Sequence, residues 1–244
     1  MKTLALVTRN RKEILRDPIS LVFFIGVPLV MLIILSVMQK NMPYNLFEIE
    51  KLAPGMAVFS FSFISLFSGM LIAKDRSSWF LTRLFASPLS SSDFIIGYSL
   101  PLLAIALLQS AVCFITAFFF GLSIDINVLL TILILIPSAI LFIGLGLLLG
   151  CVFNDKQVGG IASMVIMLVS FLGGIWYNLD MMGETLKTIS NVLPFVHSVK
   201  LTQSVLNGSY SEMNSHIIWV LAYTVIVFAT AILVFKKKMD SDNI

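Results

Sequence analysis

The sequence predicts an all-α integral membrane protein, with six membrane-spanning helices in a single domain over residues 1–244. Apolar residues make up 58% of the chain and charged residues 12%, whereas soluble domains carry about 45–50% and about 25%. A soluble fold of this size could not bury so much apolar surface, so the solvent must be lipid. The same composition excludes disorder, a nucleic-acid-binding arm and an ordinary cytosolic enzyme.

Long stretches without charge predict the number of spans. Six stretches of more than 20 residues contain no charged side chain. A helix needs about 20 apolar residues to cross about 30 Å of hydrocarbon, so each stretch suffices for one crossing and none for two. The runs are solid rather than alternating, which favours helices over a β-barrel. We expect spans at about residues 19–38, 52–73, 97–120, 128–151, 158–177 and 216–235.

The distribution of basic residues predicts the orientation. Six spans place both termini on one side, and that side then carries twelve of the 16 Lys and Arg residues. Because basic residues gather in cytoplasmic segments, we expect a multi-pass protein of the cell membrane with both termini in the cytoplasm. The first apolar run is longer than a signal-peptide core and lacks an Ala-x-Ala-like cleavage site, so we expect it to remain in the mature protein.

Residues 1–17 are predicted to form a basic amphipathic helix. Leu4, Val7, Ile14 and Leu15 share one helical face, and the charged residues lie off it. Such a helix lies on the cytoplasmic leaflet with its cations near anionic headgroups, although it could also serve only as a positive topology anchor. Pro28 is expected to kink the first span.

The cytoplasmic segment 73–101 has the most informative pattern. Ser77 or Ser78 can cap a short helix that ends before Pro88. One face of this helix would carry Phe80, Leu81, Leu84 and Phe85, and another Trp79 and Arg83. A helix with aromatic residues on two faces has too much apolar surface for a free loop. One face can lie against the bundle and the other is available to a partner protein, with a helix in the headgroup layer as the alternative.

Other connections carry local signals. Ser90–Asp93 is expected to cap the third span, and Asn154–Gln157 to form a tight hairpin. Outside, residues 178–215 are expected to form two short re-entrant or interfacial helices around Pro194, with a plain external loop as the alternative. Gly146 and Gly150 have a GxxxG spacing, which more often marks helix packing within one chain than a dimer seam.

Motifs for catalysis are absent from the sequence. There is no GxxxxGK[ST], HExxH or GxSxG pattern, so we expect no catalytic site, no metal and no cofactor in this chain. His197 and His216 are expected as interfacial residues on the outer side. The span centres lack charged residues, which argues against an ion-coupled secondary carrier. Any energy source is therefore expected to be a separate ATPase.

Three segments resemble ABC-2 type transporter permeases, the membrane subunits of ABC exporters. They read RNRKEILRDPISLVFFIGVPL (9–29), RSSWFLTRLFASPLSSSDFIIG (76–97) and NVLPFVHSVKLTQSVLNGS (191–209). They are similar to the family's amphipathic elbow helix with its kinked first span, its charged stretch before Ser-Pro-Leu-Ser, and its Leu-Pro segment with an external re-entrant hairpin. Where the family often has Glu before Gly-Thr, this chain has Asp75 and Ser77-Ser78.

The resemblance implies a dimer with a second copy or a paralogue, two ATP-binding subunits that carry the ATP, and outward transport. It implies a coupling helix that inserts into the ATPase, formed by Asp75, Arg76, Ser77, Trp79, Phe80, Arg83 and Leu84. We expect an apolar path for an amphipathic drug, peptide or lipid. The candidate contacts are Phe23, Phe24, Phe59, Phe63 and Phe67, although such residues more often face lipid or pack internally. A non-transporting anchor or sensor subunit, and less so a secondary carrier, are the alternatives.

Overall fold

The fold is a bundle of long helices. The computed structural model describes residues 2–78, 80, 90–123, 125–177, 179–181 and 183–241, and these ranges contain helices and no strand. The helices are α1 (Lys2–Leu15), α2 (Pro18–Lys40), α3 (Ile49–Ser77), α5 (Ser91–Phe119), α6 (Ile126–Val152), α7 (Asp155–Leu172), the 3-10 helix η1 (Leu179–Met181), α8 (Glu184–Val192), α9 (Pro194–Leu206) and α10 (Tyr210–Ser241). The predicted all-helical class is confirmed.

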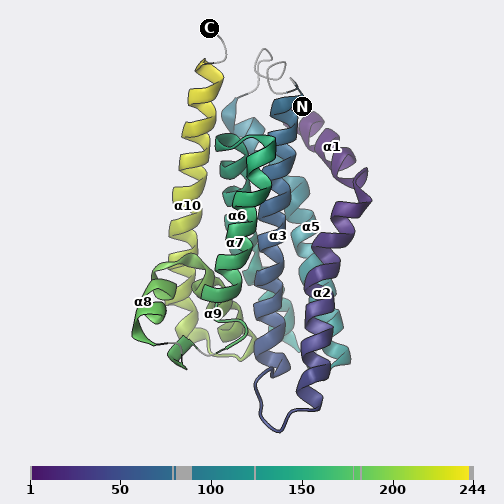
Figure 1. Cartoon of the computed structure of the whole chain (residues 1–244), viewed down its shortest axis with the longest axis vertical. Coiled ribbons are helices and arrows are strands. Elements are labelled where there is room, and N and C mark those ends of the chain that lie inside the picture. The colour runs from purple at the N-terminus through teal and green to yellow at the C-terminus, as the bar shows by residue number, and fades with distance from the viewer. Residues whose placement is uncertain are drawn as a thin grey trace.

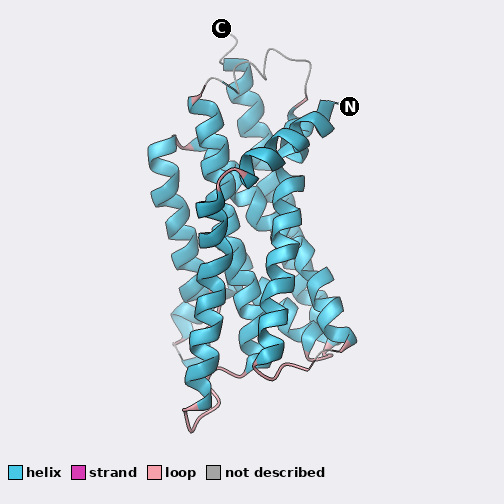
Figure 2. Ribbon diagram, turned by 90° about the vertical axis from the view of Figure 1, so that its right-hand side faces the viewer, coloured by secondary structure: helices cyan, strands magenta, loops and turns pink. Residues whose placement is uncertain are grey.

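Six of these helices are long and apolar enough to cross a membrane, namely α2, α3, α5, α6, α7 and α10. They run side by side along the long axis, with α1 and the last turns of α10 at one end and α8 and α9 at the other (Figure 1). The helix α1 lies across its end of the bundle at a steep angle to the long helices (Figure 2). Most of α3 is buried, because it packs against α2, α5, α6, α7 and α9.

Of the helix boundaries that differ from the expected spans, two have clear local reasons. The third long helix already begins at Ser91, because the side chains of Ser90 and Asp93 form a capping box in front of it. The fifth ends at Leu172 rather than at residue 177. Gly173 caps its C-terminus, and Gly174 takes a φ of +66°, which a residue with a side chain rarely adopts.

Glycines bring α3 and α6 into close contact. A Cβ atom on Gly150 would lie 2.5 Å from the carbonyl oxygen of Gly69, and one on Gly146 would overlap the Ser68 hydroxyl. That hydroxyl donates hydrogen bonds to the carbonyl oxygens of Ser65 at 3.1 Å and Ile143 at 3.3 Å. The GxxxG spacing therefore serves packing within this chain.

Two prolines leave carbonyl groups that side chains of other helices satisfy. Pro28 has no N–H for the carbonyl of Phe24, and Gln109 Nε2 of α5 donates to that oxygen at 2.6 Å. Pro101 similarly frees the carbonyl of Gly97, to which Asn10 Nδ2 of α1 donates at 3.1 Å. A proline in one helix thus creates a docking point for a polar side chain of another.

The two short helices expected before the last span are present. Pro194 occupies the first turn of α9, and the chain turns at Asn207 and Gly208, where φ is +71°. The helix α9 is largely buried against α3, α6 and α10, whereas α8 is mostly exposed. The tight connection before α7 is also confirmed, with Asn154 and Gln157 as a capping box.

Candidate functional site

The candidate site is the contact of α1 with the ends of α3 and α5, and we call its four polar residues, Arg9, Asn10, Asp75 and Tyr98, the α1 junction. The helix α1 docks through Leu6, Asn10 and Ile14, which recur every four residues and are all buried. Leu6 fits against Gly97, where a Cβ atom would lie 2.5 Å from the leucine Cδ2. The absence of a side chain at this point lets the helices approach.

Only part of the expected apolar face of α1 is exposed. Leu4 and Leu15 are 67% and 63% exposed, as a face directed toward lipid requires, whereas Ile14 is buried in the bundle. The helix also buries a stripe that was not expected, formed by Leu6, Asn10 and Ile14. The outward leucines remain free to contact lipid.

At the centre of the α1 junction is the carboxylate of Asp75, which is 2% exposed. Arg9 binds it through both terminal guanidinium nitrogens, with Nη2 donating to Oδ1 at 2.7 Å, and the Tyr98 hydroxyl donates to Oδ2. A buried carboxylate is costly unless it is paired and hydrogen-bonded, and here both oxygens have donors. The result is a fixed contact of α1, α3 and α5.

Asn10 extends the contact to the backbone of α5. Its amide nitrogen donates to the carbonyl of Gly97, and its oxygen accepts from Arg9 Nη1 at 2.9 Å. The guanidinium carbon of Arg9 also lies 4.1 Å from the centre of the Phe80 ring, a cation–π contact. Arg9 therefore contacts both sides of the boundary between α3 and the segment that follows it.

Further polar contacts surround the α1 junction. Thr3 Oγ1 donates to Asp93 Oδ1 at 2.6 Å at the start of α5. Lys74 Nζ lies 3.0 Å from Glu13 Oε1, and this hydrogen bond lowers the pKa of the Glu13 carboxyl. Arg76 donates to the carbonyl oxygens of Cys151 and Phe153 at 2.7 Å each and so caps the end of α6. The ends of α1, α3, α5 and α6 are thereby connected.

The structure places the expected ATPase contacts in different surroundings. The side chains of Asp75 and Arg76 point into the bundle, where they bind Arg9 and the end of α6. Ser77 is exposed, and Phe80 is half-buried beneath Arg9. Trp79, Arg83 and Leu84 lie outside the described residues. Asp75 and Arg76 thus make contacts inside this chain, and their contact with an ATPase stays a prediction.

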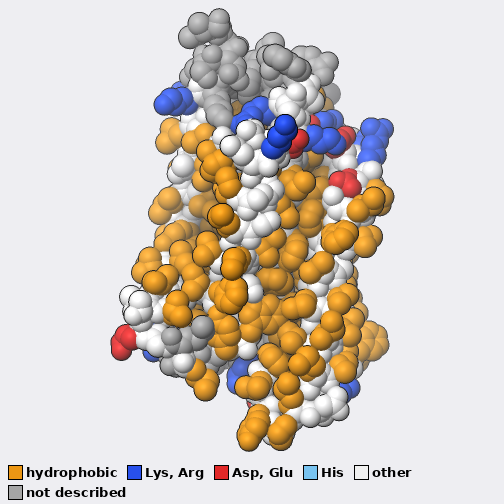
Figure 3. Space-filling view, in the orientation of Figure 1, with side chains coloured by type: hydrophobic (Ala, Val, Ile, Leu, Met, Phe, Trp, Pro, Cys, Tyr) orange, Lys and Arg blue, Asp and Glu red, His pale blue; other side chains and the backbone are white. Residues whose placement is uncertain are grey.

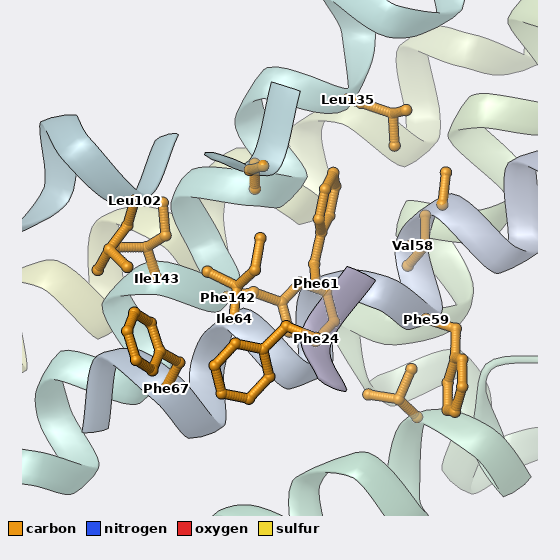
Figure 4. Close-up of a cluster of buried hydrophobic side chains, with 14 of the residues drawn as sticks. Phe24, Val58, Phe59, Phe61, Ile64, Phe67, Leu102, Leu135, Phe142 and Ile143 are labelled. Carbon is orange, nitrogen blue, oxygen red and sulfur yellow. The ribbon is translucent and has the colours of Figure 1, made fainter. Parts of the chain in front are cut away.

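The expected substrate contacts are mostly core residues. Phe24, Phe59 and Phe67 are buried, and the rings of Phe24 and Phe67 are 4.8 Å apart at their centres (Figure 4). Phe63 is half-buried with its ring centre 5.4 Å from that of Phe59, and Phe23 is 62% exposed. Contact with a substrate stays a prediction.

Sequence reasoning missed Arg9, Asn10 and Tyr98. Asn10 carried a usable signal, since it lies four residues from both Leu6 and Ile14 and so interrupts an apolar stripe. A polar residue in such a stripe needs a partner. The partner, a carbonyl freed by Pro101, could not be identified without the packing of α1 on α5.

The two histidines form a pair at the opposite end. Their Nδ1 atoms lie 2.9 Å apart, and His197 Nε2 lies 2.9 Å from the Asn191 carbonyl oxygen. A carbonyl only accepts, so His197 carries its proton on Nε2 and its Nδ1 accepts from His216. Burial lowers the pKa of the His197 imidazole. Among the described residues no group of three or more His, Cys, Asp and Glu side chains is placed to hold a metal ion.

Comparison with known proteins agrees with this architecture. The family model of the ABC-2 type transporter matches residues 1–207. A protein of Pyropia yezoensis named "Putative transport permease ycf38" is 34% identical over 121 residues, which is 48% of this chain and 42% of that protein. The chain therefore aligns with less than half of that relative's length. The family match includes the whole α1 junction.

Proposed function

Because the chain belongs to the ABC-2 type transporter family, we propose that it is the membrane-spanning permease subunit of an ATP-driven exporter. Permeases of this family are multi-pass membrane components that work with ATP-binding cassette subunits and are not themselves catalytic. ATP binding and hydrolysis are assigned to the partner subunit, and this chain holds no cofactor of its own. The proposed cargo is an amphipathic drug, peptide or lipid moved outward.

The α1 end of the bundle is proposed to face the cytoplasm. Lys and Arg side chains gather at this end, and apolar side chains cover the face below it (Figure 3). Basic residues favour the cytoplasmic side, so both termini belong there. In this orientation α1 is the elbow helix of the family, α8 and α9 are external, and the protein belongs in the cell membrane.

The observation that carries the proposed mechanism is the buried bond between Arg9 and Asp75, with Tyr98 on the same carboxylate. The proposed coupling segment, residues 77–86, begins two residues after Asp75, and α5 begins at Ser91, five residues after the segment ends. A push on this segment by the ATPase would therefore reach α3, α5 and α1 together. ATP can shift the transporter only by its different affinity for the two states, and a rigid connection lets the bundle respond to that shift.

A complete exporter is proposed to need a second permease. A copy of this chain or a paralogue would complete the path between the two subunits, and each would dock one ATP-binding subunit. The exposed apolar side chains of α2 and α7, such as Phe23, Met164 and Met167, are available for lipid or for this partner.

ATP-dependent transport in reconstituted vesicles tests the proposal. The chain is purified with the ATP-binding subunit that accompanies it, and uptake of a fluorescent amphipathic probe into inside-out vesicles is measured with and without ATP. We expect uptake only with ATP. The double variant Arg83→Glu/Trp79→Ala should abolish both uptake and stimulation of ATP hydrolysis, whereas Lys156→Gln, a charge change in another cytoplasmic segment, should not.

The alternatives give different results in the same assay. An anchor or sensor subunit would bind the ATPase without any ATP-dependent uptake of cargo. A secondary carrier would transport without ATP and stop when the ion gradient is dissipated. Normal uptake and ATPase stimulation by the well-expressed double variant would show that the coupling role is wrong.

A further inference from the structure

An apolar groove opens on the outer face of the bundle between α5, α6 and α10. It has a volume of about 360 Å³. Its walls include Ile96 and Leu103 of α5, Ile143 of α6, and Phe228 and Ile232 of α10. Phe228 passes over Gly144 of α6, where a Cβ atom would lie 2.5 Å from the ring. The groove is distinct from the α1 junction, which lies on the neighbouring face of α5 around Gly97.

The length of the groove suits one leaflet. Its lining along α5 runs from Ser92 to Leu103. At 1.5 Å per residue this is about 16 Å of helix, and half of the hydrocarbon core is about 15 Å thick. The groove therefore begins near the α1 end and finishes near the middle of the bilayer, which is the depth that one acyl chain occupies.

Positive charge lies at the mouth of the groove. The rings of Phe94 and Phe235 stack with their centres 3.8 Å apart, which places the start of α5 and this turn of α10 at one level. Lys236 and Lys237 follow directly and are exposed. Lys236 comes four residues after Ile232, so it continues the helical side that lines the groove. The nearby Asp93 carboxylate already accepts hydrogen bonds from Thr3 and Ser90.

We propose that this groove is a binding site for an anionic phospholipid from the leaflet at the α1 end. An acyl chain lies along Ile96, Leu103 and Phe228, and the phosphate contacts Lys236 and Lys237. Basic clusters beside apolar grooves at a membrane surface favour anionic headgroups. A second copy of the chain fits less well, since a symmetric contact across this groove would bring the two lysine pairs together.

Native mass spectrometry of the full-length purified chain tests the site, because one spectrum reports both bound lipid and oligomeric state. The delipidated protein is incubated with phosphatidylglycerol or with phosphatidylcholine of the same acyl chains. We expect at least tenfold preference for phosphatidylglycerol. Lys236→Gln/Lys237→Gln should remove the preference, and Lys156→Gln, the same charge change at the same end on α7, should leave it intact.

Variants that fill the groove separate chain binding from headgroup binding. Ile96→Trp should reduce retention of both lipids, whereas Leu108→Trp, an exposed position on α5 outside the groove, should not. If Ile96→Trp fails to fold, Leu100→Trp, at another position in the lining, replaces it. Equal binding of both lipids by the unchanged chain would overturn the proposal. So would unchanged lipid retention with a loss of dimer in Ile96→Trp, which would assign the groove to a second copy.

Discussion

The hydroxyl of Tyr98 donates one hydrogen bond to Asp75, and the effect of removing this hydrogen bond on stability can be measured. Tyr98→Phe keeps the ring and removes the donor to Asp75, while both Arg9 bonds stay in place. A hydrogen bond to a charged group contributes about 1.5–3 kcal/mol, so we expect a loss of stability in that range. Thermal unfolding of the purified protein measures it. Tyr44→Phe, at a 73% exposed position, is the matched control, and equal behaviour of the two variants would contradict the role of Tyr98.

The hydrogen bond from Gln109 to the Phe24 carbonyl is possible because Pro28 has no N–H to donate to that carbonyl. A double-mutant cycle can therefore test this dependence. In the natural chain Gln109→Leu removes the donor to the Phe24 carbonyl, and we expect a cost of about 1 kcal/mol. In a Pro28→Ala background the alanine N–H can supply that carbonyl, so the same change should cost almost nothing. Unfolding free energies of the four proteins give the coupling. Equal costs in both backgrounds would mean that Pro28 does not create the site.

Among the helices, the α3–α6 contact is the one most sensitive to an added methyl group. In Gly146→Ala the new Cβ would overlap the hydroxyl of Ser68 and the backbone of Ser65, so the helices must separate. We expect a loss of about 1–3 kcal/mol, typical of overpacking. Gly160→Ala on α7 is the control, because no heavy atom lies within 4 Å of its added Cβ and helix propensity favours alanine. Similar unfolding temperatures for both would contradict the close α3–α6 contact.

The contact of α9 with α10 is predicted to weaken in acid. Burial, with the positive charge of Lys200 nearby, lowers the pKa of His197 below the ordinary value of 6.5. The unfolded chain therefore binds a proton at higher pH than the folded chain does. Stability from this residue is complete above about pH 6.5 and decreases as the pH falls toward the folded-state pKa. Unfolding temperatures from about pH 8 to about pH 5 measure this loss, which His197→Gln should diminish. An equal loss in that variant would assign the acid effect to other groups.

Element types could be predicted from sequence, but the partners of polar residues could not. The stretches without charged residues predicted the six long apolar helices. Local caps such as Ser90–Asp93 could be recognised because both partners lie within one helical turn. The family resemblance assigned Asp75 to the helix that contacts the ATPase, without indicating that its side chain is buried. Its burial depends on Arg9, 66 residues away, and on Tyr98, 23 residues away. Such pairings follow from helix packing, to which a single sequence gives no direct access.

At the scale of the whole molecule, the function requires that the proposed coupling segment and the α1 junction face the compartment that contains ATP. The clustering of Lys and Arg at that end supports this orientation (Figure 3). The opposite end, with α8 and α9, must then be accessible from outside the cell. Orientation can therefore be tested separately from transport, and an inverted protein could not couple to a cytoplasmic ATPase.

Single cysteines report this orientation directly. The two natural thiols, Cys113 and Cys151, are buried and are replaced by alanine to give a silent background. Ser209→Cys, in the exposed turn before α10, should react with a membrane-impermeant maleimide on intact cells. Ser77→Cys, exposed at the end of α3, should react only after the membrane is permeabilised, because the bilayer separates it from the reagent. The reverse pattern would place the α1 junction outside the cell, where a cytoplasmic ATPase could not push on it.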